Sequence, residues 1–168
     1  MEDMYIPFGL CDITFGQQQL KAIGSEGIFS SVSKFEELRG GQGNEIVNFI
    51  ESNNEVKFTI SLTDASKESL KLYMSNLTDY KGGLLDTGFN GLNSAPLIIH
   101  PRDAGESKEY DICIFNAYIS PKTPFERIYD KSTVPFNIEF VARKTNIENF
   151  KSKFFIGDWS ELGVMNFA

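Results

Sequence analysis

The chain has 168 residues and a formal net charge of −7, from 16 Lys and Arg against 23 Asp and Glu. This length suits one domain with its own core, and an aromatic content of 13% excludes an acidic disordered protein, because disordered segments are poor in aromatics. The charge excludes a protein that grips nucleic acid across a broad basic face, since such binding needs Lys and Arg to neutralise phosphates.

The start of the chain has the wrong charge for a secretory signal, because residues 1–4 carry two acids and no Lys or Arg. The longest purely aliphatic run, residues 97–99, is far shorter than a membrane-spanning helix. We therefore expect synthesis in a cytosol-like compartment and no membrane partner. In such a compartment Cys11 and Cys113 are predicted to be reduced thiols in the core.

Alternation of apolar and polar side chains, typical of half-buried antiparallel strands, recurs along the chain. It is clearest in residues 56–62 and in residues 134–142. Residues 110–118 are apolar on both faces, with Ala117 on the face of Cys113, which predicts a central strand covered on both sides. Shorter strands are predicted at residues 11–15, 27–35, 46–51 and 97–100.

One segment, residues 65–77, follows a helical period instead. Asp64 is the predicted N-cap, and the glycine pair at residues 82–83 stops the helix. One short helix among about seven strands predicts an α+β fold that is mainly antiparallel β, of the β-sandwich or barrel type. The apolar face of this helix consists of Leu70, Tyr73, Met74 and Leu77.

Three stretches are predicted to be irregular. Residues 39–44 are a glycine-rich turn that opens a long excursion reaching residue 53, and residues 81–96 are a long polar loop. Loops of this length in a compact domain usually serve a function. Residues 145–168 are predicted to be a short helix followed by an extended arm, which divides the chain into a β domain (1–144) and a C-terminal arm (145–168).

The sequence shows no set of residues that indicates catalysis, a metal site or a cofactor site. His100 is the only histidine and has no cluster of ligands near it in sequence, so it is predicted to be a structural residue at a strand end. The acids of residues 103–111 are expected to form a solvated hairpin rim. Trp159 and Tyr129, outside the clear strands, leave open a non-catalytic β-sandwich module that binds carbohydrate or protein.

Several motifs occur in an order that resembles phage tail tube proteins. The likeness begins with Cys-Asp-Ile-Thr-Phe-Gly at residues 11–16 and a glycine-led strand at residues 27–30. It continues with the strand at residues 55–62 that runs into the helix, and with Leu-Ile-Ile-His-Pro at residues 97–101. Phe-Ile-Gly-Asp at residues 155–158 resembles a terminal signature of these proteins. The departures are the loop at 81–96 and the aromatic arm.

The resemblance implies a structural subunit, not an enzyme, that forms a homohexameric ring. Stacked rings would make a hollow conduit for DNA ejection in a virion tail, assembled in the host cytoplasm. DNA and a tape-measure protein would pass through the lumen without specific binding, and sheath or terminator proteins would be further partners. Closing subunits into a barrel also removes the open sheet edges that invite aggregation.

The resemblance assigns contact roles to three groups of residues, with no catalytic, metal or cofactor residue among them. The loop that reaches the next ring is Arg39, Gly40, Gly41, Gln42, Gly43 and Asn44. The candidate lumen face is Lys57, Thr59, Ser61, Asn137 and Glu139. The arm contacts are Phe154, Phe155 and Trp159. The net acidity further predicts that acids face the lumen, where like charge keeps a polyanion off the wall.

Overall fold

The structure is a computed structural model that describes residues 9–20, 27–132, 134–147 and 150–163. It is mainly antiparallel β with one short α-helix, which confirms the predicted fold class, although the sheet does not close into a barrel. The elements are β1 (Cys11–Phe15), β2 (Gln18–Leu20), β3 (Gly27–Gly40), β4 (Glu45–Leu62), α1 (Lys67–Tyr73), β5 (Leu77–Tyr80), β6 (Gly83–Asp86), β7 (Ser94–Pro101), the 3-10 helix η1 (Arg102–Ala104), β8 (Ile112–Ile119), β9 (Phe136–Ala142), β10 (Thr145–Ile147), β11 (Phe150–Ser152), β12 (Phe154–Ile156) and the 3-10 helix η2 (Trp159–Leu162).

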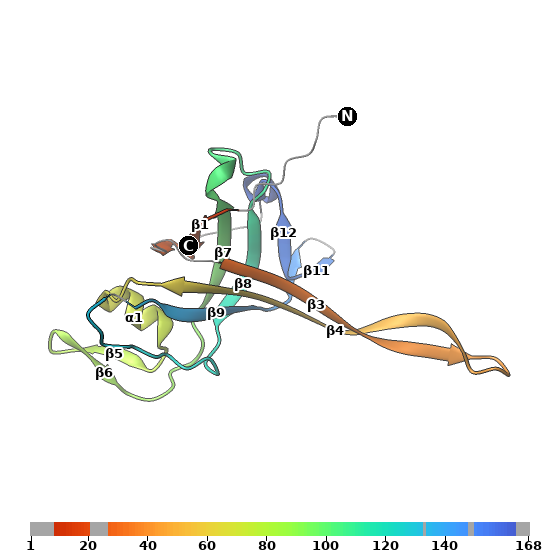
Figure 1. Cartoon of the computed structure of the whole chain (residues 1–168), viewed down its shortest axis with the longest axis horizontal. Coiled ribbons are helices and arrows are strands. Elements are labelled where there is room, and N and C mark those ends of the chain that lie inside the picture. The colour runs from red at the N-terminus through yellow and green to blue at the C-terminus, as the bar shows by residue number, and fades with distance from the viewer. Residues whose placement is uncertain (1–8, 21–26, 133, 148–149, 164–168) are drawn as a thin grey trace.

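One eight-stranded sheet organises the molecule, in the order β2-β1-β7-β8-β9-β4-β3, with β12 also paired to β8. β7 pairs with β8 along most of its length, while on the other edge of β8 the start pairs with β12 and the end pairs with β9, so this strand joins two halves of the sheet. The small hairpins β5–β6 and β10–β11 stand apart from it. The β3–β4 pair projects far beyond the body (Figure 1).

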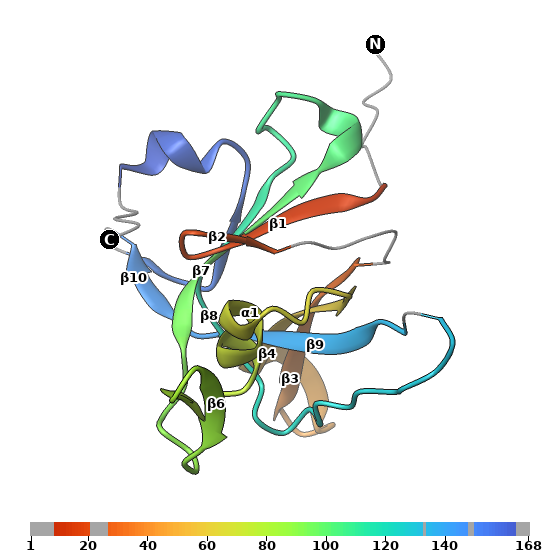
Figure 2. The same cartoon turned by 90° about the vertical axis from the view of Figure 1, so that its left-hand side faces the viewer.

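The core lies where the two halves of the sheet fold over one another. Phe15 of β1 meets Phe140 of β9 with ring centroids 5.2 Å apart, and Phe58 of β4 lies 6.5 Å from Phe140. The apolar alternation of residues 56–62 faces this core, as predicted. Figure 2 shows α1 between the β1–β2 hairpin and the β4–β9 pair, where Tyr73 packs against the core.

The helix is shorter than its apolar period predicts. Ser66, not Asp64, is the N-cap, and its hydroxyl accepts a hydrogen bond from Ser69 N at 3.3 Å. Asp64 supports this start from two residues earlier, because its carboxylate accepts bonds from Ser66 N and from the buried Ser69 hydroxyl. Leu77, expected at the helix end, begins β5 instead.

The central strand β8 is covered on both sides, as predicted, but one residue changes face. Ile114 belongs to the main core, while Cys113 and Phe115 form a second apolar cluster with the C-terminal segment. The register with β7 shifts between Ala95 and Leu97, so β8 carries one extra residue there. A bulge of this kind reverses the alternation, and Ala117 therefore faces the main core, not the Cys113 side.

Three stretches predicted to be irregular are more regular than expected. The excursion expected at residues 39–53 is mostly strand and includes the predicted strand at residues 46–51, because β3 and β4 pair almost to their shared turn. The stretch 81–96 contains β6 and the start of β7, leaving residues 87–93 without strand. The predicted helix after residue 145 is wrong: β10, β11 and β12 occupy that stretch, followed by η2.

Removing the ring of Phe140 should destabilise the fold strongly, because this residue is fully buried between both halves of the sheet. We expect Phe140→Ala to lower the free energy of unfolding by about 3–5 kcal/mol, measured by urea denaturation. Phe89→Ala is the matched control, since Phe89 is exposed and should change stability by less than about 0.5 kcal/mol. Equal effects of the two substitutions would contradict this description of the core.

Candidate functional site

The residues predicted to contact the next ring lie together at the tip of the β3–β4 hairpin. Residues 41–44 form its turn, with positive φ at Gly41 (77°) and Asn44 (52°), a conformation that glycine and asparagine tolerate best. Arg39 pairs with the Glu37 carboxylate and donates to the Asn44 carbonyl at 3.4 Å, which ties the turn to its strands. Their contact with a neighbouring ring stays a prediction.

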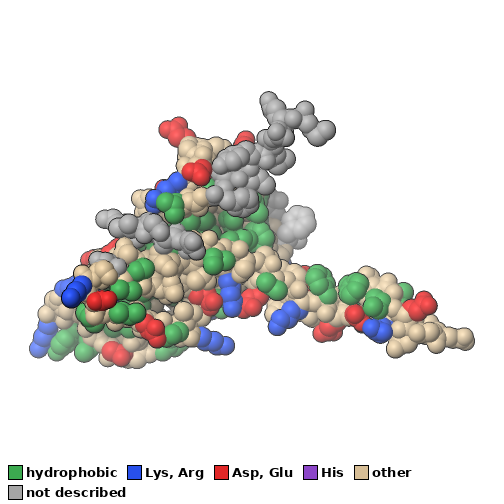
Figure 3. Space-filling model, in the orientation of Figure 1, with side chains coloured by type: hydrophobic (Ala, Val, Ile, Leu, Met, Phe, Trp, Pro, Cys, Tyr) green, Lys and Arg blue, Asp and Glu red, His purple; other side chains and the backbone are tan. Residues whose placement is uncertain are grey.

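The projecting part of the hairpin, residues 34–51, also carries six large apolar side chains that its own chain leaves exposed; Val47, the most exposed, is 67% accessible. Figure 3 shows hydrophobic side chains along the projecting ribbon. Sequence reasoning predicted strands at residues 27–35 and 46–51, but it missed their pairing into a hairpin beyond the core because it treated residues 39–53 as an excursion between strands. The six are Phe35, Leu38, Ile46, Val47, Phe49 and Ile50.

One face of the hairpin lies on the core-facing side of the sheet. Phe29 of β3 stands opposite Phe58 of β4, and both contribute to the core. Phe35 has the same parity along β3 as Phe29, and Phe49 shares that face because it stands opposite Glu37. Polar residues at positions 31, 33 and 54 separate Phe35 and Phe49 from the core on this face, so these two form a second apolar stretch out in solvent. Uncovered apolar surface of this kind marks an interaction site.

The five residues of the candidate lumen face do lie together on one face of the β4–β9 pair. Thr59 stands opposite Glu139, and the Ser61 hydroxyl donates to Asn137 Oδ1 at 2.6 Å. Lys57 Nζ lies 3.7 Å from Glu139 Oε2. Their face is the one turned away from the core, since the alternate residues of both strands are buried. That this face lines a lumen stays a prediction.

This face does not carry the excess of acids that the net charge predicts for it. Lys57 lies between Glu55, at 3.0 Å, and Glu139. The hydrogen bond and charge of Lys57 lower the pKa of Glu55, and the same bond raises the pKa of Lys57. Lys34 shares the face on β3, and Arg143 follows at the end of β9. Acidic side chains do not outnumber basic ones here, so the acidity of the chain lies elsewhere.

The three predicted arm residues pack on the body of their own chain. Phe154 and Phe155 lie on β12, which pairs with β8. The Phe154 ring is 5.1 Å from Phe29 at the edge of the main core, while Phe155 and Trp159 cover the second cluster. Their contact with a neighbouring subunit, and the boundary at residues 144–145, stay predictions.

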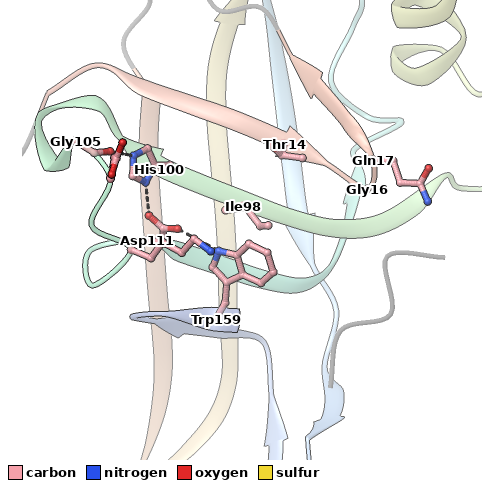
Figure 4. A pocket seen from close by; sticks show the side chains of 10 residues that line it. Thr14, Gly16, Gln17, Ile98, His100, Gly105, Asp111 and Trp159 are labelled. Carbon is pink, nitrogen blue, oxygen red and sulfur yellow. Dashed lines mark hydrogen bonds and ion pairs between the residues drawn. The ribbon is translucent and has the colours of Figure 1, made fainter. Parts of the chain in front are cut away.

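A polar centre that the sequence did not predict joins β7, β8 and η2 (Figure 4). Asp111, expected on a solvated rim, is only 2% exposed. Its carboxylate accepts a hydrogen bond from His100 Nδ1 at 2.5 Å and another from Trp159 Nε1 at 3.1 Å. His100 Nε2 donates to the Gly105 carbonyl at 2.9 Å. The bond from Trp159 crosses 48 residues of sequence, which no local pattern reveals.

Both ring nitrogens of His100 face acceptors, and this arrangement favours the doubly protonated imidazolium. Burial acts against the charge, but the hydrogen bonds to Asp111 and to the Gly105 carbonyl outweigh it, so the pKa of His100 is raised above its usual value. The histidine is therefore structural, as predicted. It balances a buried carboxylate that would otherwise be an unpaired charge.

The same centre forms one wall of an open hollow of about 580 Å³. Four segments line it: the β1–β2 hairpin with Thr14 and Gln17, strand β7 with Ile98, the loop before β8 that ends at Asp111, and η2 with Trp159. Lys108 stands on the rim, with Nζ 5.0 Å from the centre of the indole ring.

The remaining reactive side chains give little support for chemistry. Burial raises the pKa of the Cys113 thiol to about 12 and also raises that of Cys11, so both thiols are protonated and unreactive near neutral pH. In the part of the chain that the structure describes, no group of three or more His, Cys, Asp or Glu side chains is placed to hold a metal ion. No described helix has the length and apolar character needed to cross a membrane.

The two aromatics of the alternative binding-module hypothesis lie in different places. Tyr129 is 85% exposed on the loop before β9, with the Arg127 guanidinium 5.3 Å from its ring centre. Trp159 is half-buried in the hollow described above. They line separate pockets, so they do not form one shared platform.

The fold is that of a mainly antiparallel β subunit with a projecting hairpin. No protein-family model and no curated protein matches the chain. Among solved structures, it is similar to a chain of the PVC sheath–tube complex of an extracellular contractile injection system in the extended state, with 14% identity and a TM-score of 0.51 over 83% of this chain and 87% of that one. It is equally similar to a chain of the sheath/tube terminator of that system in the extended state, with 14% identity and a TM-score of 0.52 over 84% and 93%.

These likenesses confirm, at the level of fold, the resemblance to tail tube proteins that the order of motifs indicates. The chain shares its fold with chains of the sheath–tube and sheath/tube terminator complexes of a contractile injection system.

The raised pKa of His100 should make stability depend on pH in a definite direction. A histidine whose folded pKa exceeds its unfolded value of 6.5 stabilises the protein fully below that value and loses this effect as pH rises through the folded pKa. We expect the free energy of unfolding to fall as the pH rises from about 6.5 through the raised pKa of His100, and this fall to shrink in His100→Gln. Urea unfolding across the pH series measures it. An unchanged slope in the variant would contradict the proposed charge state.

Proposed function

We propose that the chain is a structural, non-catalytic subunit of the tube of a contractile, phage-tail-like particle. The single observation that carries the proposal is the projecting hairpin, which holds six large apolar side chains in solvent beyond the end of the core. A two-stranded ribbon alone is only marginally stable in water. Its apolar surface is explained if further copies cover it in an assembly.

In this proposal, copies associate side by side into a hexameric ring, and rings stack into a hollow conduit. The free edges of the sheet, β2 and β3, support this step, because open edges favour pairing with another chain and a closed ring removes them. The face with Lys57, Thr59 and Ser61 would line the lumen. DNA or a tape-measure protein would pass through the lumen without a specific binding site. The subunit itself would be made in the host cytoplasm with the rest of the particle.

The balance of charge on this face changes the expected behaviour of the lumen. A wall with equal numbers of acids and bases neither holds phosphates strongly nor repels them. Passage would then rely on the absence of a net attraction, and a polymer of either sign would be tolerated. Sheath proteins would contact the outer side of the ring, and no cofactor is needed for any of these roles.

A second role, a terminator subunit that ends the tube, has comparable support, since the likeness to the chain from the sheath/tube terminator is as strong and covers 93% of that chain. Labelling with gold-conjugated antibody separates the two. Label along the whole tube supports a tube subunit, whereas label at one end supports a terminator. A carbohydrate-binding module, the third hypothesis, would require glycan binding that is lost in Tyr129→Ala.

Replacing an apolar residue of the hairpin with a charge should stop assembly and leave the subunit folded. We expect Phe49→Lys to abolish rings and tubes in negative-stain electron microscopy, because burying an unpaired ammonium in the contact costs several kcal/mol. The unfolding midpoint should stay near that of the parent chain, since Phe49 is exposed.

Phe89→Lys serves as the control, because Phe89 is equally apolar and exposed but lies outside the hairpin. Parent protein that stays monomeric at high concentration would contradict the tube proposal. Tubes formed normally by Phe49→Lys would contradict the role of the hairpin.

A further inference from the structure

We propose that the hollow beside Trp159 receives apolar side chains of the hairpin from a second copy of the chain. The inference rests on the proposed function and names one contact within it. Figure 1 shows the hairpin projecting away from the body, while β1 and β7, which supply part of the hollow, lie within the body and far from the hairpin tip. A hairpin therefore cannot reach the hollow of its own chain.

The hollow has the size and chemistry of a built site. Its volume of about 580 Å³ lies within the range of pockets that bind ligands, which is roughly 300–1,000 Å³. Ile98 and the indole of Trp159 supply apolar surface (Figure 4). The indole cannot turn freely, because its Nε1 is bonded to the buried Asp111, which His100 holds in turn. A rigid aromatic wall of this kind suits an apolar side chain that arrives from outside.

The hairpin has the complementary features. Val47 is the most exposed large apolar residue of the ribbon. It is the extra residue of a bulge in β4, because its neighbours Asn48 and Ile46 pair with the consecutive residues Leu38 and Arg39 of β3, and a bulge re-aims side chains. Residues 34–51 carry four Glu against one Lys and one Arg. On the hollow, Lys108 stands beside Glu106 on the rim, above the indole. An incoming acidic ribbon would thus meet a lysine at the entrance to an apolar pocket.

The placement of the two surfaces sets the kind of assembly. A projection and a receiving hollow on different parts of one molecule form a head-to-tail contact, in which each copy donates a hairpin and accepts another. Such a contact can close reciprocally in a dimer, close into a ring or repeat into an open stack, and the ring and the stack need copies that are offset from one another. This is the geometry that a tube requires.

Photo-crosslinking with the assembled, full-length chain tests the inference. A benzoylphenylalanine at position 47 should crosslink to a second copy, and mass spectrometry should place the link within residues 98–111 or at Trp159. A probe at position 108 should link back to residues 35–50 of another copy. A probe at position 129 is the control, because Tyr129 is exposed on a different loop and should give neither link.

Three outcomes are distinguishable. Tubes whose position-47 crosslinks fall elsewhere would overturn this inference and leave the proposed function intact. A position-108 probe that links only to residues 1–8 or 164–168 of its own chain would also overturn it, since the hollow would then hold the ends of the same chain. Chains that form no ring or tube at all would overturn the proposed function itself.

A charge reversal gives an independent readout. We expect Lys108→Glu to raise the protein concentration needed for assembly by about tenfold, because a like charge would face the acidic hairpin. Lys122→Glu makes the same change at an exposed site away from the hollow and should assemble as the parent does. Assembly of Lys108→Glu at the parent concentration would overturn the contact.

Discussion

The length of β4 relative to the core is the constraint on which the rest of the structure depends. The strand has 18 residues, and only its second half, from Val56 onward, alternates between buried and half-buried positions. The core that Phe140 and Phe15 build is too short to cover the first half. The ordered ribbon with apolar side chains beyond the core follows directly, and so does the need for a partner to cover it.

The parts of the fold that the sequence predicted are those in which one chain buries one face. The strands at residues 56–62 and 136–142 and the helix near residue 70 show a clear period because each lies on the core. The hairpin gave only the shorter strand signals at residues 27–35 and 46–51, since both faces of its projecting part carry apolar and charged side chains and neither is buried within the chain. A regular apolar period in the sequence indicates burial against the core of the same chain. Apolar residues that another chain would cover need not follow such a period.

The polar centre was missed for a separate reason. Asp111 is buried through partners at His100 and Trp159, far from it in sequence, and nothing adjacent distinguishes it from the acids of the exposed rim. The face of Ala117 was missed because a single bulge reverses the alternation after Ile114. The predicted lumen residues did come together, since cross-strand register places alternate residues of paired strands side by side. Their charge could not be deduced from composition, which counts acids without placing them.

The order of strand pairing also has a consequence for how the subunit folds. The β3–β4 hairpin pairs residues close in sequence, whereas β1 and β7 pair Cys11 with Pro101 across most of the domain. Local hairpins form in roughly 1–10 μs, and pairings of long sequence separation come much later because of the entropy of closing a long loop. The newly made chain would thus expose its apolar β3–β4 hairpin before the body that receives a hairpin has folded. We therefore expect such a subunit to be produced where partner copies are abundant and fold quickly. Otherwise its exposed hairpin would bind other chains incorrectly.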